Sequence, residues 1–266
     1  MVAVIVRTIK DRWRALLAYT LIGAGSQWMY ISLYPTFQKS MVDYDAMFKN
    51  MPEAFMKIIN LDNFSMNTLE KYLTMEMYSM FWLILTILLT ISLAGQAFAG
   101  DIERETIVQT ASQPISRKNI FIGKALAGAA IFTVFNVMVN AVVFPLASLY
   151  NIPYDATHFL TIFVMGELFG LTLLSVALCL SAWAFERGRV IMIMSGLVLV
   201  MYVMNIVAGI TASLENLKYF SFFHYFNPGQ ALIHGQYNGT SIGLFLGVIA
   251  VTLGIGFWKF VKRDIA

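Results

Sequence analysis

Six long apolar segments, separated by more polar connections, dominate the hydropathy pattern of this chain. They cover about residues 15–34, 77–99, 120–149, 158–183, 190–210 and 241–260. Each is close to or longer than the roughly 20 residues that a helix needs to cross a hydrocarbon core about 30 Å thick. Backbone polar groups must find their partners within such a segment, which a helix achieves. We therefore predict an all-α integral membrane protein with six transmembrane helices, organised as a single membrane domain over residues 1–266.

The composition agrees with a membrane protein and excludes several other classes. Apolar residues make up 59% of the chain and charged residues 12%, against roughly 45–50% and 25% in soluble domains. The length of 266 residues fits one membrane domain and leaves no room for a soluble catalytic domain. The net charge of +3 comes from basic residues scattered among the ends of the spans, so no nucleic-acid partner is expected.

The segments that flank the spans predict additional surface helices. Residues 2–14 place apolar side chains on one helical face and basic side chains on the other, which is typical of an interfacial helix; the alternative is a basic flank of the first span. Residues 40–74 and 211–240 are expected to form helices at the outer surface. The first of these segments is interpreted as a lid over the span ends or as a gate, and Asn67–Glu70 as a capping box that opens the second span.

The distribution of basic residues predicts the orientation. Thirteen of the 18 Lys and Arg residues fall in the N-terminal segment, the connections after spans two and four, and the C-terminal segment. The other five fall in the connections after spans one and five. Because cytoplasmic segments carry the excess of Lys and Arg, both termini are expected in the cytoplasm.

The longest charged segment between two strongly apolar runs extends from Gly100 to Lys124, between the second and third spans. A bilayer core does not tolerate this charge density, so the segment must lie in water or against a protein. It resembles the cytoplasmic loop between spans two and three of type-2 (ABC-2) exporter permeases. The residues that match in order and spacing are Glu103, Thr106, Pro114, Ile115, Ser116, Arg117, Gly123 and Lys124. The departures are Glu105, where the family usually has Gly, and Thr110–Ala111, where it usually has two leucines; they make the loop more polar than usual.

The resemblance implies a permease subunit of an ATP-driven ABC exporter, which moves a substrate across or out of the plasma membrane of a prokaryote by alternating access. In such exporters this loop is a coupling helix that docks on a separate ATPase subunit, present in two copies, which binds the ATP. A second permease subunit, identical or homologous, completes the path, and membrane lipid surrounds it. The residues expected to form the ATPase-coupling loop are Asp101, Glu103, Arg104, Thr106, Pro114, Ser116 and Arg117.

The sequence contains no motif for chemistry of its own. Gly123–Lys124 lacks the upstream glycine of a phosphate-binding loop and is followed by Ala125, so neither ATP binding nor a cofactor is expected in this chain. His158, His224 and His234 have no spacing known for a metal site. Neither a catalytic nor a metal-binding residue is therefore assigned.

Glu167 is the exception, because it is an acidic residue inside the fourth span, within Gly166-Glu-x-x-Gly170. A carboxylate there is costly, so it is expected to be protonated, paired or facing a water-filled cavity. It is a candidate pathway residue that contacts a cationic or polar substrate, a proton relay, or a protonated group hydrogen-bonded between helices. The alternative function is a membrane enzyme or secondary transporter that uses Glu167 and the outer-side histidines.

Two further patterns concern helix packing. Asn136 and Asn140 lie one turn apart in the third span, and we expect them to hydrogen-bond within the bundle. Gly243-x-x-x-Gly247 in the sixth span suggests close packing, either within the subunit or across a dimer.

Overall fold

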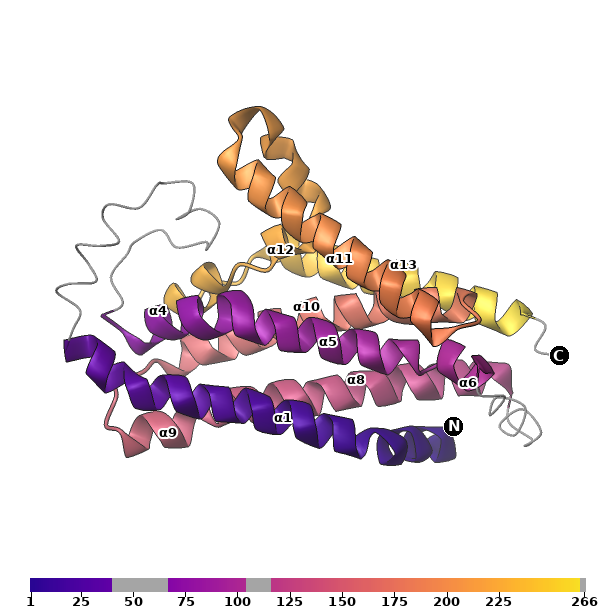
Figure 1. The fold of residues 1–266 in the computed structure, drawn as a ribbon, viewed down its shortest axis with the longest axis horizontal. Coiled ribbons are helices and arrows are strands. Elements are labelled where there is room, and N and C mark those ends of the chain that lie inside the picture. Colours follow the sequence, from indigo (N-terminus) through magenta and orange to yellow (C-terminus); the bar gives the residue numbers. More distant parts are fainter. Residues whose placement is uncertain (40–66, 104–115, 264–266) are drawn as a thin grey trace.

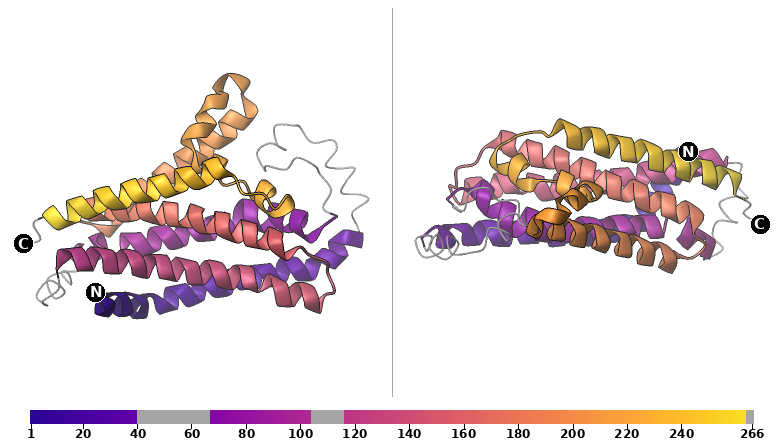
Figure 2. Two further views of the ribbon diagram at one scale, coloured as in Figure 1. Left: turned by 180° about the vertical axis from the view of Figure 1, so that it is seen from behind. Right: turned by 90° about the horizontal axis from the view of Figure 1, so that it is seen from above.

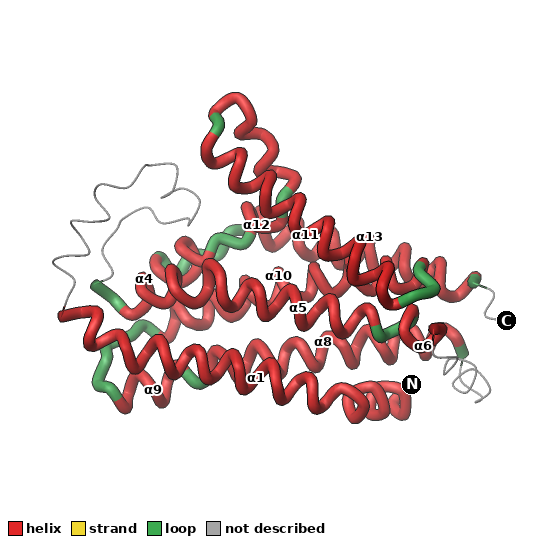
Figure 3. Tube along the Cα trace, viewed as in Figure 1, coloured by secondary structure: helices red, strands yellow, loops and turns green. Residues whose placement is uncertain are grey.

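The computed structural model describes residues 1–39, 67–103 and 116–263, and in these ranges it is helical without strands. The long helices lie roughly side by side along one axis (Figure 1), and the loops gather mainly near the two ends of the bundle (Figure 3). The long helices are α1 (Val2–Lys39), α5 (Trp82–Gly95), α8 (Arg117–Ala141), α10 (Ala156–Trp183), α11 (Arg187–Ile210) and α13 (Gly239–Lys262). The shorter elements are α4 (Leu69–Leu73), the π-helix η1 (Thr74–Phe81), α6 (Ala99–Glu103), α9 (Val143–Leu149), the 3₁₀-helix η2 (Ala212–Phe220), α12 (Phe222–Tyr225) and the π-helix η3 (Gly229–Ile233).

Five stretches of the described residues are long and apolar enough to cross a membrane. They are Leu69–Gly95, Arg117–Leu149, Ala156–Trp183, Arg187–Ile210 and Gly239–Lys262, and they correspond to the second to sixth predicted spans. The second begins at Leu69 rather than Met77 and ends at Gly95 rather than Ala99. Helix α1 is not among the five because its sequence is more polar, so the six-span layout stays a prediction.

Helix α1 differs from the prediction of a separate interfacial helix. It runs without interruption from Val2 to Lys39, with no break near Ala15. Its first turns are seen nearly end-on in Figure 1, whereas the rest of the helix lies across the view, so the helix bends near its start. The interfacial segment is therefore the beginning of α1 and not an element of its own. It contacts α8, where an added Cβ on Gly123 would lie 3.1 Å from Val4.

The helix ends are set by local capping. Ser116 begins α8 by accepting a hydrogen bond from the backbone N–H of Asn119 (3.3 Å), as expected for an N-cap serine. The predicted capping box at Asn67–Glu70 is wrong. Thr68 is the N-cap, through the N–H of Lys71 (3.4 Å), and the carboxylate of Glu70 instead accepts from the backbone N–H of Asp155 (2.8 Å).

Helix α10 lies at the centre of the bundle, against α5, α8 and α13. Seen from above, α11 and α13 flank it on opposite sides (Figure 2). Two glycines allow these close approaches. A Cβ added to Gly170 would lie 1.9 Å from Cζ of Phe132 on α8, and one added to Gly256 would lie 3.1 Å from Cα of Cys179 on α10.

Of the two alternatives for Gly243 and Gly247, packing inside the subunit does not occur among the described residues. An added Cβ at either position would meet no atom within 4 Å. Both glycines lie on the outer side of α13, so packing against another molecule is the alternative that remains.

The segment after α11 combines an exposed part with a buried part. Helix α11 tilts away from the bundle and carries η2 beyond it (Figure 1). Phe226 returns to the core, where its ring stacks on Trp82 (centroids 5.3 Å apart) and on Phe169 (4.9 Å). Residues 211–240 thus include the helices η2, α12 and η3, and their position at the outer surface stays a prediction. Residues 40–66 lie outside the described residues.

Candidate functional site

The ends of the predicted coupling loop meet at the end of the bundle that holds α6, where α1 begins and α13 ends (Figure 1). Asp101 and Glu103 belong to α6, and Ser116 and Arg117 begin α8. Arg104, Thr106 and Pro114 lie outside the described residues. We call this region the α6 end of the bundle.

The first anchor of α6 is an ion pair between Lys124 and Asp101. The ammonium of Lys124 also donates to the carbonyl of Ala97 and lies 5.5 Å from the centroid of the Phe98 ring. The Lys124 side chain is only 7% exposed and that of Asp101 is 27% exposed. Breaking a buried pair leaves an uncompensated charge, so this contact holds α6 against α8.

The second anchor is a hydroxyl group from α10. The buried side chain of Ser181 accepts hydrogen bonds from the backbone N–H groups of Phe98 (3.2 Å) and Ala99 (3.1 Å). These are donors at the start of α6 that have no partner within the helix. The hydroxyl of Ser181 thus provides acceptors for these two N–H groups where the chain passes from α5, which ends at Gly95, into α6.

The third anchor joins α6 to the start of α11. A carboxylate oxygen of Glu103 accepts from the backbone N–H of Arg187 (2.8 Å). The N-cap residue of α11, Glu186, makes no side-chain capping bond itself, so Glu103 caps α11 from a different element. A carboxylate at this position also interacts favourably with the helix dipole.

Arg117 connects the start of α8 to the end of the chain that the structure describes. Its guanidinium donates to the carbonyl of Arg263. The guanidinium of Arg263 donates in turn to the carbonyls of Ala182 and Ala184 (2.9 Å each) and lies 3.9 Å from the centroid of the Phe185 ring. Burial lowers the pKa of Arg263 from its ordinary value. These bonds tie α8, α10 and α13 together at the α6 end.

A second cluster lies in the middle of the bundle, around Glu167. One oxygen of its carboxyl accepts from the hydroxyl of Thr133 (2.5 Å), and the other accepts from the amide of Asn136 (2.9 Å). The Asn136 amide also donates to the carbonyl of Phe163 (3.2 Å). The two groups that donate to the carboxyl are neutral and belong to α8, so the fourth predicted span is joined to the third by hydrogen bonds.

The hydrogen bonds continue from Asn136 to α1. The amide of Asn140 donates to the side-chain oxygen of Asn136 (2.9 Å), and both residues hydrogen-bond within the bundle, as predicted. The hydroxyl of Tyr78 donates to Asn140 (2.7 Å) and accepts from the amide of Gln27 (3.1 Å). Tyr78 lies in the π-helix η1, a type of element that is frequent at functional sites.

The histidines predicted on the outer side do not gather into a metal-binding cluster within the described residues. No group of three His, Cys, Asp or Glu side chains among the described residues could hold a metal ion. His158 lies 3.9 Å from the carboxylate of Asp155, and His224 lies between the rings of Tyr219 and Tyr225. Burial, together with the charge of Lys218, lowers the pKa of His224.

The fold and these clusters define a multi-pass helical membrane protein with an interlocked charged end. The sequence model described as "ABC-2 family transporter protein" matches residues 5–265, so the chain belongs to this family. It is accordingly a membrane permease of an ABC transporter, a transport subunit and not a catalytic enzyme. Permeases of this family normally work with an ATPase subunit and often with a second permease. A search of curated proteins finds no match.

Proposed function

We propose that this chain is the permease subunit of an ATP-driven exporter in the plasma membrane of a prokaryote, with both termini in the cytoplasm. Two permease subunits, identical or homologous, form the path, and two separate ATPase subunits bind the ATP. The family and the thirteen basic residues assigned to one side support this proposal. The position of the first residues of α1 and the last residues of α13 at the same end also supports it (Figure 1).

The observation that carries the proposal is the triple anchoring of α6. The helix directly preceding the predicted docking loop is fastened to α8 by Lys124, to α10 by Ser181 and to α11 by the carboxylate of Glu103. A helix held on three sides moves together with its neighbours. A displacement of the loop by a closing ATPase pair would therefore reach three spans at once, which is what alternating access requires.

Asp101 and Glu103 have partners in α8 and α11, so their first role is to hold α6. Arg104 and Thr106 belong to the same predicted coupling loop, and the family resemblance makes them candidates for contact with the ATPase. Losing one member of a charge pair across a protein contact costs about 2–5 kcal/mol, enough to weaken assembly severely.

The test is co-purification of the ATPase with an affinity-tagged permease that carries Arg104→Glu. The matched control is Lys218→Glu, the same charge reversal in η2, which projects beyond the bundle away from the α6 end (Figure 1). We expect the first variant to reach the membrane at the parental level but to lose most of the ATPase, and the second to retain it. Equal recovery of the ATPase in both variants would show that Arg104 lies outside the docking contact.

A further inference from the structure

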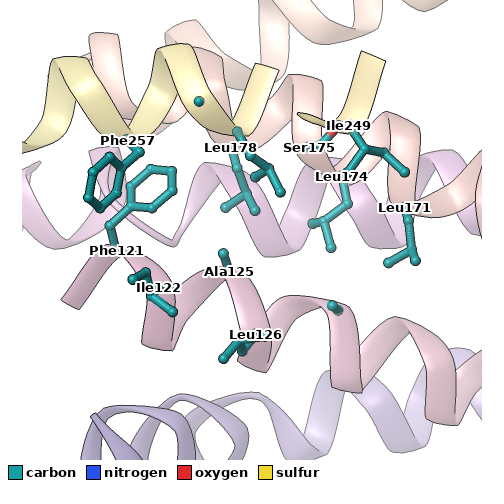
Figure 4. Close-up of a pocket in the computed structure, with 13 residues that line it drawn as sticks. Phe121, Ile122, Ala125, Leu126, Leu171, Leu174, Ser175, Leu178, Ile249 and Phe257 are labelled. Atoms are coloured by element: carbon teal, nitrogen blue, oxygen red, sulfur yellow. The ribbon is translucent and has the colours of Figure 1, made fainter. Parts of the chain in front are cut away.

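Helices α8, α10 and α13 leave a groove between them, with a volume of about 410 Å³. Figure 4 shows Ala125 and Leu126 of α8 on one side, Leu174 and Leu178 of α10 along the groove, and Phe257 of α13 across it. Of the side chains that line it, only Ser175 is polar. Its hydroxyl donates to the carbonyl of Thr172 (2.8 Å) and accepts from Thr252 (2.9 Å). The groove therefore offers an apolar surface without free hydrogen-bonding groups.

The carboxyl group of Glu167 lies just beyond one end of this groove. Leu171 and Ala129 line that end. Glu167 precedes Leu171 by four residues and Thr133 follows Ala129 by four, so each lies one turn, about 5.4 Å, further along the same helix face. The hydroxyl oxygen of Thr133 connects the two sides, because it lies 3.0 Å from the carbonyl oxygen of Ala129 and 2.5 Å from a carboxyl oxygen of Glu167. Glu167 is only half-buried.

This carboxyl has neutral partners and stands at the middle of its span. Its hydrogen bonds come from Thr133 and Asn136, and no ion pair to it is formed among the described residues. Acidic groups inside a membrane are costly and mark substrate or ion pathways. A positive charge at the end of the groove would compensate the carboxylate, and an attached apolar body would gain by leaving water for the groove.

We propose that this groove binds a lipophilic organic cation, whose apolar part lies between α8, α10 and α13 and whose charge lies beside Glu167. The inference rests on the proposed transport function and names its substrate class. The groove occupies the half of these spans nearer to the α6 end, because Phe121 and Phe257 lie near the start of α8 and the end of α13. A cation dissolved in the inner half of the bilayer would therefore reach it sideways.

Two other occupants would fill the groove without using the carboxyl group. An acyl chain of a membrane lipid, or the apolar face of a second permease, fits an apolar surface but brings no positive charge to Glu167. Binding of these occupants should therefore not depend on the charge of the ligand or of Glu167, whereas binding of the proposed cation should. The experiment is designed to measure this difference.

The experiment measures equilibrium binding of radiolabelled tetraphenylphosphonium to the full-length chain in lipid nanodiscs without ATP, with empty nanodiscs correcting for partition into lipid. Tetraphenylborate, of the same shape and opposite charge, is the matched ligand. We expect saturable binding of the cation and no saturable binding of the anion.

Glu167→Gln, which keeps the size of the side chain, should weaken cation binding at least tenfold. Ala125→Phe, which fills the groove, should do the same, whereas Ala130→Phe, an exposed position on α8 outside the groove, should leave it unchanged.

Several results would overturn the inference: absence of saturable cation binding to the parent, equal binding of the borate, or unchanged affinity in Glu167→Gln. If Glu167→Gln does not insert into the membrane, two comparisons still test the inference. They are the affinity of Ala125→Phe against that of Ala130→Phe, and the binding of the phosphonium against that of the borate. Neither ATP nor the ATPase is present in this measurement. A negative binding result would therefore contradict the proposed substrate class and not the proposed role as a permease subunit. Conversely, the result of the co-purification experiment does not affect the binding measurement.

Discussion

Replacing Gly170 with alanine tests the close contact between α8 and α10. The added Cβ would lie 1.9 Å from Cζ of Phe132 and 2.3 Å from Cε1, far inside van der Waals contact. Phe132 is fully buried, so its ring has little room to move, and α8 and α10 must separate or the ring must leave its rotamer. Overpacking of this kind costs typically 1–3 kcal/mol. The same crossing aligns Thr133 and Asn136 with Glu167, so separation would also weaken those bonds.

The assay is thermal unfolding of the detergent-purified chain, followed by size-exclusion chromatography of heated samples. For a chain of this size, 1 kcal/mol corresponds to about 2–4 °C in Tm, so we expect Gly170→Ala to lower the Tm by several degrees. Gly196→Ala is the matched control, because an added Cβ there would meet nothing within 4 Å in the middle of α11. It should leave the Tm unchanged or raise it, since alanine favours helix more than glycine does.

A second substitution identifies the cause of the effect. Adding Phe132→Leu to Gly170→Ala makes room for the new methyl group, so the double variant should recover part of the lost Tm. A Tm for Gly170→Ala equal to that of the parent would refute the close crossing of α8 and α10, and so would equal losses in Gly170→Ala and Gly196→Ala.

The remaining predictions concern the α6 end. Loss of one member of a buried ion pair costs about 3–5 kcal/mol of stability, and we expect Lys124→Met to fall at the lower end of this range because Asp101 keeps 27% of its side chain exposed. The double variant Lys124→Met with Asp101→Asn should recover most of the lost Tm. The absence of this recovery would contradict the ion pair. Glu103→Gln, which can still accept the hydrogen bond from Arg187 (2.8 Å), should change the Tm little. Glu103→Ala should cost about 0.5–2 kcal/mol as a lost helix cap; an unchanged Tm in Glu103→Ala would show that this cap does not form. Ser116→Cys in a Cys179→Ala background should react with a membrane-impermeant maleimide only when the cytoplasmic side is accessible, and labelling in intact cells would contradict the orientation.

The bounds of a helix could be predicted from the sequence where the hydropathy of that segment alone marks both ends. The spans at Ala156–Trp183, Arg187–Ile210 and Gly239–Lys262 were predicted to within a few residues, because their hydropathy changes sharply at polar ends. The start of the second span was missed, because the helix already includes polar residues before Met77. Glu70 and Tyr72 are nonetheless buried, the first bonded to the backbone of Asp155 and the second packed on Tyr34 with ring centroids 5.4 Å apart.

Contacts between distant segments could not be predicted from the pattern. The capping of α6 by Ser181 and the capping of α11 by Glu103 join residues more than 80 positions apart, and neither partner carries a local signal. The glycines illustrate the same point. Gly170 and Gly243 both belong to helical segments with glycine at a spacing of four, yet only Gly170 faces another helix. The prediction that Asn136 and Asn140 hydrogen-bond within the bundle is confirmed, and they also bond to each other because both lie on one helix, one turn apart.

The most direct test of the central claim is native mass spectrometry of the tagged chain, purified from its own membranes together with its bound partners. The account predicts an assembly of two permease subunits with two copies of a separate nucleotide-binding subunit, and ATP hydrolysis that disappears when this partner is removed. A chain that purifies without any nucleotide-binding partner, or that hydrolyses ATP by itself in a saturable manner, would contradict the account.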